Sequence, residues 1–400
     1  MQPLKISIFG EFWDCQIYRA RLYLFDFENK VSVYDWNKLI HKIKIADNNR
    51  LAFACAFLKS SYLYKYNDIF NDLEFKSVLL NKFNRIENKI SEFSTKDIKD
   101  CLIKEMENPF DSLPIDSEIS SNNIFAITDS GLWRSTAHRA KSEKYPISSR
   151  PEKLFDAKLL SLSANRYASI AISGGNDGLF QYSKKEVNSD FTDFIYSGRN
   201  VEKEITQLSE RHSLFSDWSN LSIFSSSDIS ESYLSLFKWA GERNTHFVRK
   251  RERNIKVEPI FEEYGDKEGL IWGGGDKIYK SQSQEILMTR FNNYAEEEKG
   301  ESLFSEIESI PLTKKIEDTL ESKVCLFGTI IETDIGLLIL GSDGSLFEIN
   351  SPPIRWRVYP RSIDFENHLH VIHENRLDIF SFNHDYFIDQ RLKLIGLSKK

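Results

Sequence analysis

The stretch that decides the fold is Gly336-Leu-Leu-Ile-Leu-Gly-Ser-Asp-Gly-Ser-Leu-Phe-Glu-Ile-Asn350. Its apolar run, Leu337 to Leu340, is typical of a buried strand, and Ser342-Asp343-Gly344 supplies residues that tolerate the positive φ angles of a tight turn. Leu346 and Ile349 then flank a half-exposed return strand. The stretch therefore predicts a β-hairpin.

Weaker copies of this hairpin recur from one end of the chain to the other. They cover residues 22–36, 51–66, 124–133, 170–182, 221–239, 270–279 and 369–380. With the hairpin at 336–350 included, their mean spacing is about 50 residues, close to the ~40–50 residues of propeller-blade repeats. Repeats of this kind bury their apolar faces against their neighbours, so residues 1–400 are expected to form a single body. The sequence predicts an all-β protein, a β-propeller of seven or eight four-stranded blades.

The N-terminal segment Lys5 to Phe9 has the pattern of a strand but lies outside the repeated hairpins. In a closed propeller the first strand of the chain can complete the last blade, so that no sheet edge stays open. We therefore expect this segment to pair with the C-terminal strands.

The period of the apolar residues changes from two to about 3.6 between residues 71 and 109, which predicts a helical-hairpin insertion in the propeller. The first helix carries one apolar stripe, which consists of Phe75, Leu79, Phe83, Ile86, Ile90 and Phe93. A capping-box pattern, Ser94-Thr-Lys-Asp97, then predicts a second helix that stops at Asn108-Pro109. Two explanations stay open: a local cap over the side of the propeller, or an arm that docks a partner.

Charge and cysteine usage are those of a cytoplasmic protein without a membrane segment. The formal net charge of −7 argues against a nucleic-acid surface that covers the whole molecule. The longest apolar run, Gly336 to Leu340, is too short to cross a bilayer, and the N-terminus lacks the pattern of a signal peptide. The four cysteines form no Cys-x-x-Cys pair, as expected for reduced thiols in the cytosol.

Aromatic residues lie at many strand ends, and two acid-aromatic pairs, Asp35-Trp36 and Asp217-Trp218, accompany them. In these features the chain resembles the WD40-type β-propeller group, over nearly its whole length apart from residues 71–109. It departs from the group in having no Gly-His dipeptide, and Asp-Trp ends only the hairpin at Trp36. The resemblance implies a rigid wheel that holds partners and does not catalyse. We expect a non-catalytic scaffold for protein-protein interaction, with one or more proteins of a larger intracellular assembly as its partners.

The candidate partner-binding residues are large apolar side chains of the helical stripe and of two polar turns. They are Phe75, Leu79, Phe83, Ile86, Trp133 and Trp272. The stripe is larger than one short second helix can cover, and an exposed apolar patch in a soluble protein usually marks a partner site. The two tryptophans lie beside polar turns, where an aromatic ring can serve as an exposed interface anchor.

Two basic loops, residues 134–144 and 243–256, favour an alternative function as a nucleic-acid-binding subunit. The candidate contacts to RNA or DNA are Arg134, Arg139, Lys141, Arg249, Lys250, Arg251, Arg253 and Lys256. Cations at this density can contact phosphates while the neighbouring Phe247 stacks on a base. The structural alternative is a solvated loop, or an anchor for the chain's own acidic segment at residues 296–306.

No catalytic, cofactor-binding or metal-binding residue is predicted. His368-x-His370 has the spacing by which a strand can chelate zinc, but no third ligand can be identified. The glycine-rich stretches 174–178 and 273–276 lack a following helix or Lys-Ser/Thr, so hairpin turns are expected there. The residue types of a Ser-His-Asp triad occur within residues 212–217, without the context of a nucleophile elbow. No spacing supports a hydrolase or lyase site.

Overall fold

The computed structural model describes residues 3–43, 49–58, 68–86, 91–137, 147–148, 150–164, 169–184, 203–218, 222–227, 232–239, 249–264, 269–292, 295, 301–316, 318–362, 364–387, 393 and 395–397. The chain forms two compact units. Unit 1 contains residues 1–113, 136–150 and 320–400, and unit 2 contains residues 114–135 and 151–319. None of the helices in the described segments has the length and apolar character that crossing a membrane requires.

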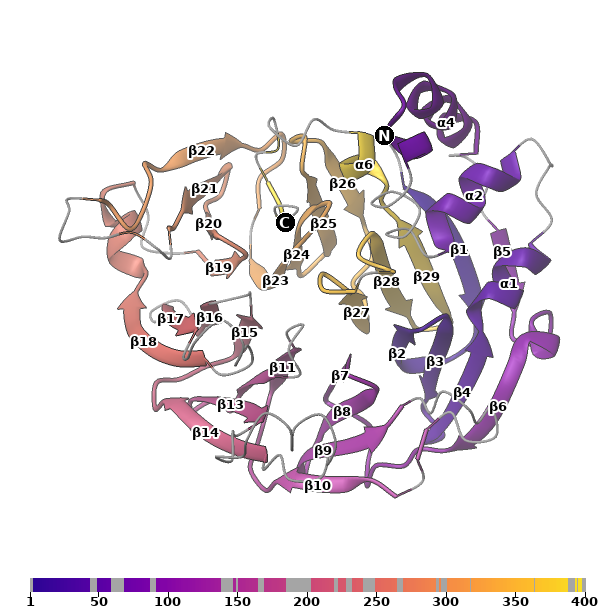
Figure 1. Ribbon diagram of the computed structural model, residues 1–400, viewed down its shortest axis with the longest axis horizontal. Coiled ribbons are helices and arrows are strands. Elements are labelled where there is room, and N and C mark those ends of the chain that lie inside the picture. The colour runs from indigo at the N-terminus through magenta and orange to yellow at the C-terminus, as the bar shows by residue number, and fades with distance from the viewer. Residues whose placement is uncertain are drawn as a thin grey trace. The chain divides into compact units, whose positions relative to one another are not determined.

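The described strands form seven sheets, which we number in chain order (Figure 1). Each sheet has the antiparallel four-stranded core of a propeller blade, so the predicted β-propeller class is confirmed, with seven blades. Sheets 2 to 5 belong to unit 2, and sheets 1, 6 and 7 belong to unit 1.

Unit 2 consists of four four-stranded sheets. Sheet 2 contains β7 (Asp116–Ser120), β8 (Asn123–Thr128), β9 (Gly131–Thr136) and β10 (Glu152–Phe155). Sheet 3 contains β11 (Ser161–Ala164), β12 (Ile170–Ser173), β13 (Leu179–Lys184) and β14 (Lys203–Ser209). Sheet 4 contains β15 (Phe215–Trp218), β16 (Ser222–Ser226), β17 (Tyr233–Trp239) and β18 (Arg249–Lys256). Sheet 5 follows the 3-10 helix η4 (Glu258–Tyr264) and contains β19 (Ile271–Gly274), β20 (Lys277–Ser281), β21 (Glu285–Arg290) and β22 (Glu308–Pro311).

Unit 1 consists of three sheets and the helices connected to them. Sheet 1 contains β2 (Phe12–Tyr18), β3 (Arg21–Asp26), β4 (Lys30–Asp35) and β6 (Leu102–Glu107). Sheet 6 contains β23 (Thr319–Cys325), β24 (Gly328–Thr333), β25 (Gly336–Gly341) and β26 (Leu346–Ile349). Sheet 7 has the order β27 (Arg355–Val358), β28 (His368–His373), β29 (Arg376–Ser381), β1 (Leu4–Phe9) and β5 (Ser91–Ser94).

The deciding stretch forms the predicted hairpin. β25 pairs with β26 from Leu337 opposite Ile349 to Leu340 opposite Leu346. Gly344 supplies the positive φ of the turn, at 80°. Gly336 begins the hairpin at φ 145°, where a Cβ would lie 2.0 Å from the carbonyl oxygen of Ile349. Only glycine fits this position without strain.

The expected pairing of the first strand with the last strands is confirmed. β1 runs antiparallel to β29, from Leu4 opposite Ser381 to Phe9 opposite Arg376, and Figure 1 shows the two ends of the colour scale side by side in this sheet. The sheet gains a further strand, because β5 pairs in parallel with β1 from Ile6 opposite Ser91 to Phe9 opposite Ser94.

One of the expected hairpins, at residues 51–66, is wrong. Its first half is the helix α2 (Arg50–Phe57), while residues 62–66 lie outside the described residues. The small, helix-favouring Ala52 and Ala56 let this segment pack closely in the core of unit 1, and both are fully buried. Asp35, of the pair Asp35-Trp36 that ends a hairpin, also begins a helix. Its carboxylate caps α1 (Trp36–Lys42) by accepting from the backbone N of Lys38 at 2.9 Å.

The helical insertion is confirmed in its first helix only. The helix α4 (Leu73–Ile86) follows the 3-10 helix η2 (Asp68–Asn71), but Phe93 already belongs to β5. The prediction of a second helix is wrong, since residues 102–107 form the strand β6, which pairs with β4. Ser94 and Asp97 do exchange the hydrogen bonds of a capping box, yet only a turn and the 3-10 helix η3 (Lys99–Cys101) follow. Pairing with the open edge of β4 overrides the local helix signal.

The apolar stripe of α4 packs into the core of unit 1. Leu79, Phe83 and Ile86 are buried in one cluster with Trp36 and Ile379, and Phe75 packs against that cluster. The C-terminal helix α6 (His384–Phe387) lies against the same surface, with the rings of Phe83 and Phe387 5.7 Å apart. This geometry favours the local-cap explanation of the helix.

Candidate functional site

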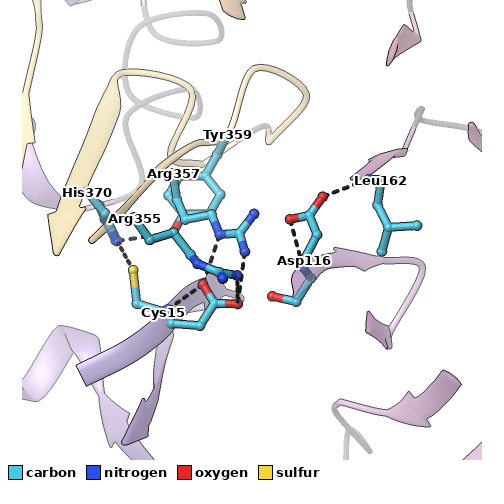
Figure 2. A network of polar contacts seen from close by, with 9 residues as sticks. Cys15, Asp116, Leu162, Arg355, Arg357, Tyr359 and His370 are labelled. Atoms are coloured by element: carbon cyan, nitrogen blue, oxygen red, sulfur yellow. Dashed lines mark hydrogen bonds and ion pairs between the residues drawn. The ribbon is translucent and has the colours of Figure 1, made fainter. Parts of the chain in front are cut away.

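A buried polar network joins sheet 1 to sheet 7 (Figure 2). Asp14 of β2 is fully buried, and its two carboxylate oxygens accept from Nε and Nη2 of Arg357, each at 2.9 Å. Arg355 adds a second guanidinium, whose Nη1 lies 3.6 Å from Asp14 Oδ2. A bidentate ion pair of this kind adds geometric specificity as well as stability, so it holds β2 and β27 in one arrangement.

The same network contains a cysteine and a histidine in contact. Sγ of Cys15 lies 3.6 Å from Nδ1 of His370, and the hydroxyl of Tyr359 lies 3.1 Å from the same nitrogen. Burial raises the pKa of the Cys15 thiol far above its usual range and lowers the pKa of His370 well below its own. A nucleophilic cysteine needs the opposite shifts, a thiolate beside an imidazolium. The contact between Cys15 and His370 is therefore a packing contact between two sheets, and burial favours the neutral form of both side chains.

His368 and His370 lie next to each other on β28, with ring centroids 5.7 Å apart. Nε2 of His368 lies 3.3 Å from the carbonyl oxygen of Ala56, so this ring contacts the helix α2. His373 contacts a different group, with Nε2 3.6 Å from Oδ2 of Asp378. Among the described residues, no three His, Cys, Asp or Glu side chains are placed to hold a metal ion.

The buried histidines predict acid sensitivity. Desolvation lowers the pKa of His368 to about 4 and also lowers the pKa of His370, so both rings stay neutral in the folded protein. The unfolded chain binds protons near pH ~6.5, so the free energy of unfolding should fall below that pH by about 1.4 kcal/mol per pH unit for each histidine. Urea denaturation at a series of pH values measures this slope. His368→Gln should flatten it, whereas His41→Gln, at an exposed position of α1, should not. Equal slopes for His368→Gln and the parent would contradict the assignment.

A second feature of unit 1 is an apolar surface at one end of its three sheets. We call it the strand-start face, because β2, β23 and β27, the first strands in the order of sheets 1, 6 and 7, begin there. The β3–β4 turn lies at this end of sheet 1, since Phe12 pairs with Asp26 at the start of β2. In sheet 7 the pairs His373–Arg376 and Phe9–Arg376 mark the same end, and in sheet 6 the turn between β24 and β25 does.

Apolar side chains gather on the strand-start face. Its members are Phe9, Trp13, Phe27, Leu320, Ile335 and Ile354, of which all except the half-buried Trp13 are exposed. Phe27 and Ile335 occupy turn positions and are 47% and 52% exposed, and Leu320 of β23 is 51% exposed. Each sheet of unit 1 therefore contributes apolar surface to this end.

Contacts within and between the sheets hold this face together. Within sheet 1 the rings of Trp13 and Phe27 meet edge to face at 5.6 Å, and Arg355 of sheet 7 contacts sheet 1 with its guanidinium 5.0 Å from the centroid of Trp13. Between sheets 6 and 7, Nε1 of Trp356 donates to Glu332 at 2.6 Å. The network around Asp14 thus supports an aromatic surface directly beside it.

The structure distributes the sequence-predicted partner residues over three environments. Leu79, Phe83 and Ile86 are buried in the protein's own core, with Phe75 partly buried beside them. Trp133 is half-buried on β9, where Nε1 donates to Ser130 Oγ at 3.0 Å. The expected exposure of Trp272 is wrong: the side chain is 3% exposed and stacks on Tyr279 at 5.5 Å. All residues of β19 are buried, so the polar turn beside it does not expose the ring.

The basic residues do not form one described surface. Arg134 is occupied, since it donates to Tyr182 at 3.1 Å and pairs with Glu152. Arg139 and Lys141 lie outside the described residues. Residues 249–256 form the outer strand β18 of sheet 4 rather than a loop, and Lys256 is exposed there. The side chains of Arg249, Lys250, Arg251 and Arg253 are outside the described part of the chain.

The remaining motifs are structural in their described contacts. The glycine-rich stretches are hairpin turns, with Gly274 opposite Lys277 in one and Gly174 N donating to Gly178 O at 2.8 Å in the other. Ser213 is fully buried, and its hydroxyl bonds those of Ser173 and Ser225. It is therefore not placed as an accessible nucleophile.

Sequence reasoning missed the strand-start face. A usable signal existed, because Phe27 stands between Asp26 and Glu28, and Ile335 stands between Asp334 and Gly336. Hairpin turns favour polar residues and glycine, so the turn conformation does not explain a large apolar residue at such a position.

Comparison with known proteins finds β-propellers among the similar solved structures. Similar solved structures include the β-propeller domain of Cps50 (Swd1) from Myceliophteria thermophila, at 9% identity over 94% of this chain and 97% of that chain, with a TM-score of 0.45. The Neurospora crassa Pan2 WD40 domain is 7% identical over 96% of each chain, with a TM-score of 0.44. Prp20p of Saccharomyces cerevisiae is 10% identical over 95% of this chain and 83% of its own, with a TM-score of 0.34. No protein-family model and no curated protein matches the sequence.

Proposed function

We propose that the protein is a non-catalytic scaffold that binds a protein partner through the strand-start face. The observation that supports this is the gathering of exposed apolar side chains at one end of all three sheets of unit 1. Single exposed apolar residues are ordinary, whereas an apolar patch on a soluble protein usually marks an interface, and we propose that these side chains form such a patch. Tryptophan and arginine are also the residues enriched at interface hot spots, and Trp13 and Arg355 lie in contact here.

The support beneath this face suits a rigid docking platform. Asp14, which follows Trp13 in the sequence, and Arg357 hold β2 and β27 together. A preorganised surface pays little ordering entropy on binding. The described Cys-His contact has both pKa values shifted away from nucleophilic chemistry, which agrees with a binding role. The four buried free thiols are typical of a protein in a reducing compartment, and we propose that the protein is cytoplasmic.

For the alternative function, RNA or DNA binding, the structure describes the backbone of β18 and, among its candidate contacts, the exposed side chain of Lys256. Charged residues on an outer strand also protect an open sheet edge from pairing with another chain, which is the simpler role for them. The alternative is therefore an outcome of the test below.

Replacing Phe27 and Ile335 together by Ser should abolish partner capture and leave the fold intact. Both side chains are about half exposed, so the melting temperature should change by no more than a few degrees. The measurement is affinity capture of the full chain from nuclease-treated extract of the cells that make it, followed by quantitative mass spectrometry. Leu73→Ser is the matched control, since Leu73 is an apolar side chain of α4 that is 82% exposed.

The expected result is a set of proteins captured by the parent and by Leu73→Ser but lost from the double variant. Identical capture by all three proteins would overturn the proposal. Capture by the parent from untreated extract that is lost after nuclease treatment would also overturn it, in favour of the nucleic-acid alternative.

A further inference from the structure

We infer that the partner segment accepted by the strand-start face is a basic amphipathic peptide. This inference rests on the proposed function and adds the chemistry of the partner. It comes from the charges that surround the apolar residues, and from which of those charges already have a partner.

Three described cations at this end of sheets 1 and 7, Arg376, Lys30 and Arg355, are already engaged. Arg376 contacts the buried Asp378 through Nε at 3.2 Å, and Lys30 forms an ion pair with Glu28 at 2.6 Å. Arg355 covers the ring of Trp13 and lies 3.6 Å from Asp14, with its side chain 15% exposed. The face therefore offers little free positive charge to an acidic partner.

The free charges are negative. Glu11, Asp334 and Glu374 are exposed and have no hydrogen bond or ion pair with any described residue. Each lies in a connection at this end of the sheets. Glu11 joins β1 to β2, Asp334 lies in the turn between β24 and β25, and Glu374 lies in the turn between β28 and β29.

Two of these carboxylates are close in sequence to apolar members of the face. Asp334 is adjacent to Ile335, and Glu11 follows Phe9 by two residues. A partner that covers this surface must present apolar side chains to the rings and cations to the carboxylates. A basic amphipathic segment does both, whereas an acidic segment would place like charges together at a cost of several kcal/mol. Because the carboxylates are exposed, they should set specificity and salt dependence more than total affinity.

The test is selection from a random peptide-display library on the full-length protein. Counter-selection on the Phe27→Ser/Ile335→Ser variant removes peptides that bind elsewhere. We expect the enriched peptides to combine a net positive charge with apolar residues spaced three and four apart. Their affinity should fall as the salt concentration rises, because exposed charges are screened beyond about 10 Å at 0.1 M salt.

Charge reversal provides the second arm. The triple variant Glu11→Lys/Asp334→Lys/Glu374→Lys should weaken a selected peptide by about tenfold or more, since three exposed ion pairs are lost and become repulsive. Glu74→Lys, on the exposed side of α4, is the matched control and should have no effect. Circular dichroism establishes that each variant is folded, and the single variant Asp334→Lys serves if the triple variant is not.

The outcomes separate the two claims. Enriched peptides that are neutral or acidic, or that bind the triple variant as well as the parent, overturn the basic-partner inference and leave the docking face in place. A selection that yields no peptide dependent on Phe27 and Ile335 overturns both.

Discussion

Phe83→Ala is expected to lower the free energy of unfolding by about 3–5 kcal/mol, because a large aromatic side chain leaves a cavity that the core cannot fill. Phe83 is 2% exposed, lies in the main core cluster of unit 1 and meets the ring of Phe387 at 5.7 Å. Urea denaturation followed by tryptophan fluorescence measures the loss. The result would establish that α4 is part of the core and not a free arm.

Leu73→Ala, in the same helix, is the matched control. Leu73 is 82% exposed, so this substitution should change the free energy of unfolding by no more than about 0.5 kcal/mol. If the two variants had equal stability, the stripe would not be packed as described, and the docking-arm explanation of the helix would return.

Asp14→Ala is expected to cost about 3–5 kcal/mol, since removing one member of a buried ion pair leaves an uncompensated charge. The carboxylate is fully buried and is held by Arg357 through two hydrogen bonds and by Arg355 through an ion pair. Denaturation midpoints for Asp14→Ala, Arg357→Ala and the double variant form a thermodynamic cycle. A large coupling free energy between the two sites is the expected outcome.

The exposed pair Glu28–Lys30 is the control for this cycle. The side chain of Glu28 is 74% exposed, and surface ion pairs contribute little to the free energy of unfolding. Additive effects of the Asp14 and Arg357 substitutions would show that the two side chains stabilise the protein independently and that the network does not link sheet 1 to sheet 7.

The sequence was most informative where a strand and its turn are neighbours in the chain. The hairpin at residues 336–350 could be predicted because its apolar run, its glycine turn and its return strand lie within one short window. Pairing of the first strand with the last could be predicted from a different argument, that a closed sheet leaves no open edge.

The errors arose where a distant part of the chain decided the local structure. Residues 102–107 carry a helical pattern after a capping box, but the open edge of β4 recruits them as a strand. Residues 50–57 form a helix because Ala52 and Ala56 fit closely in a core that is built from both ends of the chain. No local pattern contains the position of that core.

The candidate site was missed for a related reason. Phe9, Phe27 and Ile335 are far apart in sequence, and only the register of three sheets brings them to one end of unit 1. Conversely, Trp272 has a polar turn as its neighbour in sequence but is enclosed by its own sheet. Exposure depends on the stacking of strands, which a single sequence does not encode locally.

The parallel strand β5 affects the order in which strands can pair while the chain is being synthesised. Arg376 is synthesised 367 residues after its partner Phe9, which at ~5–20 residues per second leaves β1 without β29 for about 20–70 s. Ser94, which also pairs with Phe9, follows it by only 85 residues and is made within about 4–17 s at the same rates. We therefore expect β5 to occupy one edge of the nascent N-terminal strand long before its final partner leaves the ribosome, and to shield that edge from pairing with neighbouring chains.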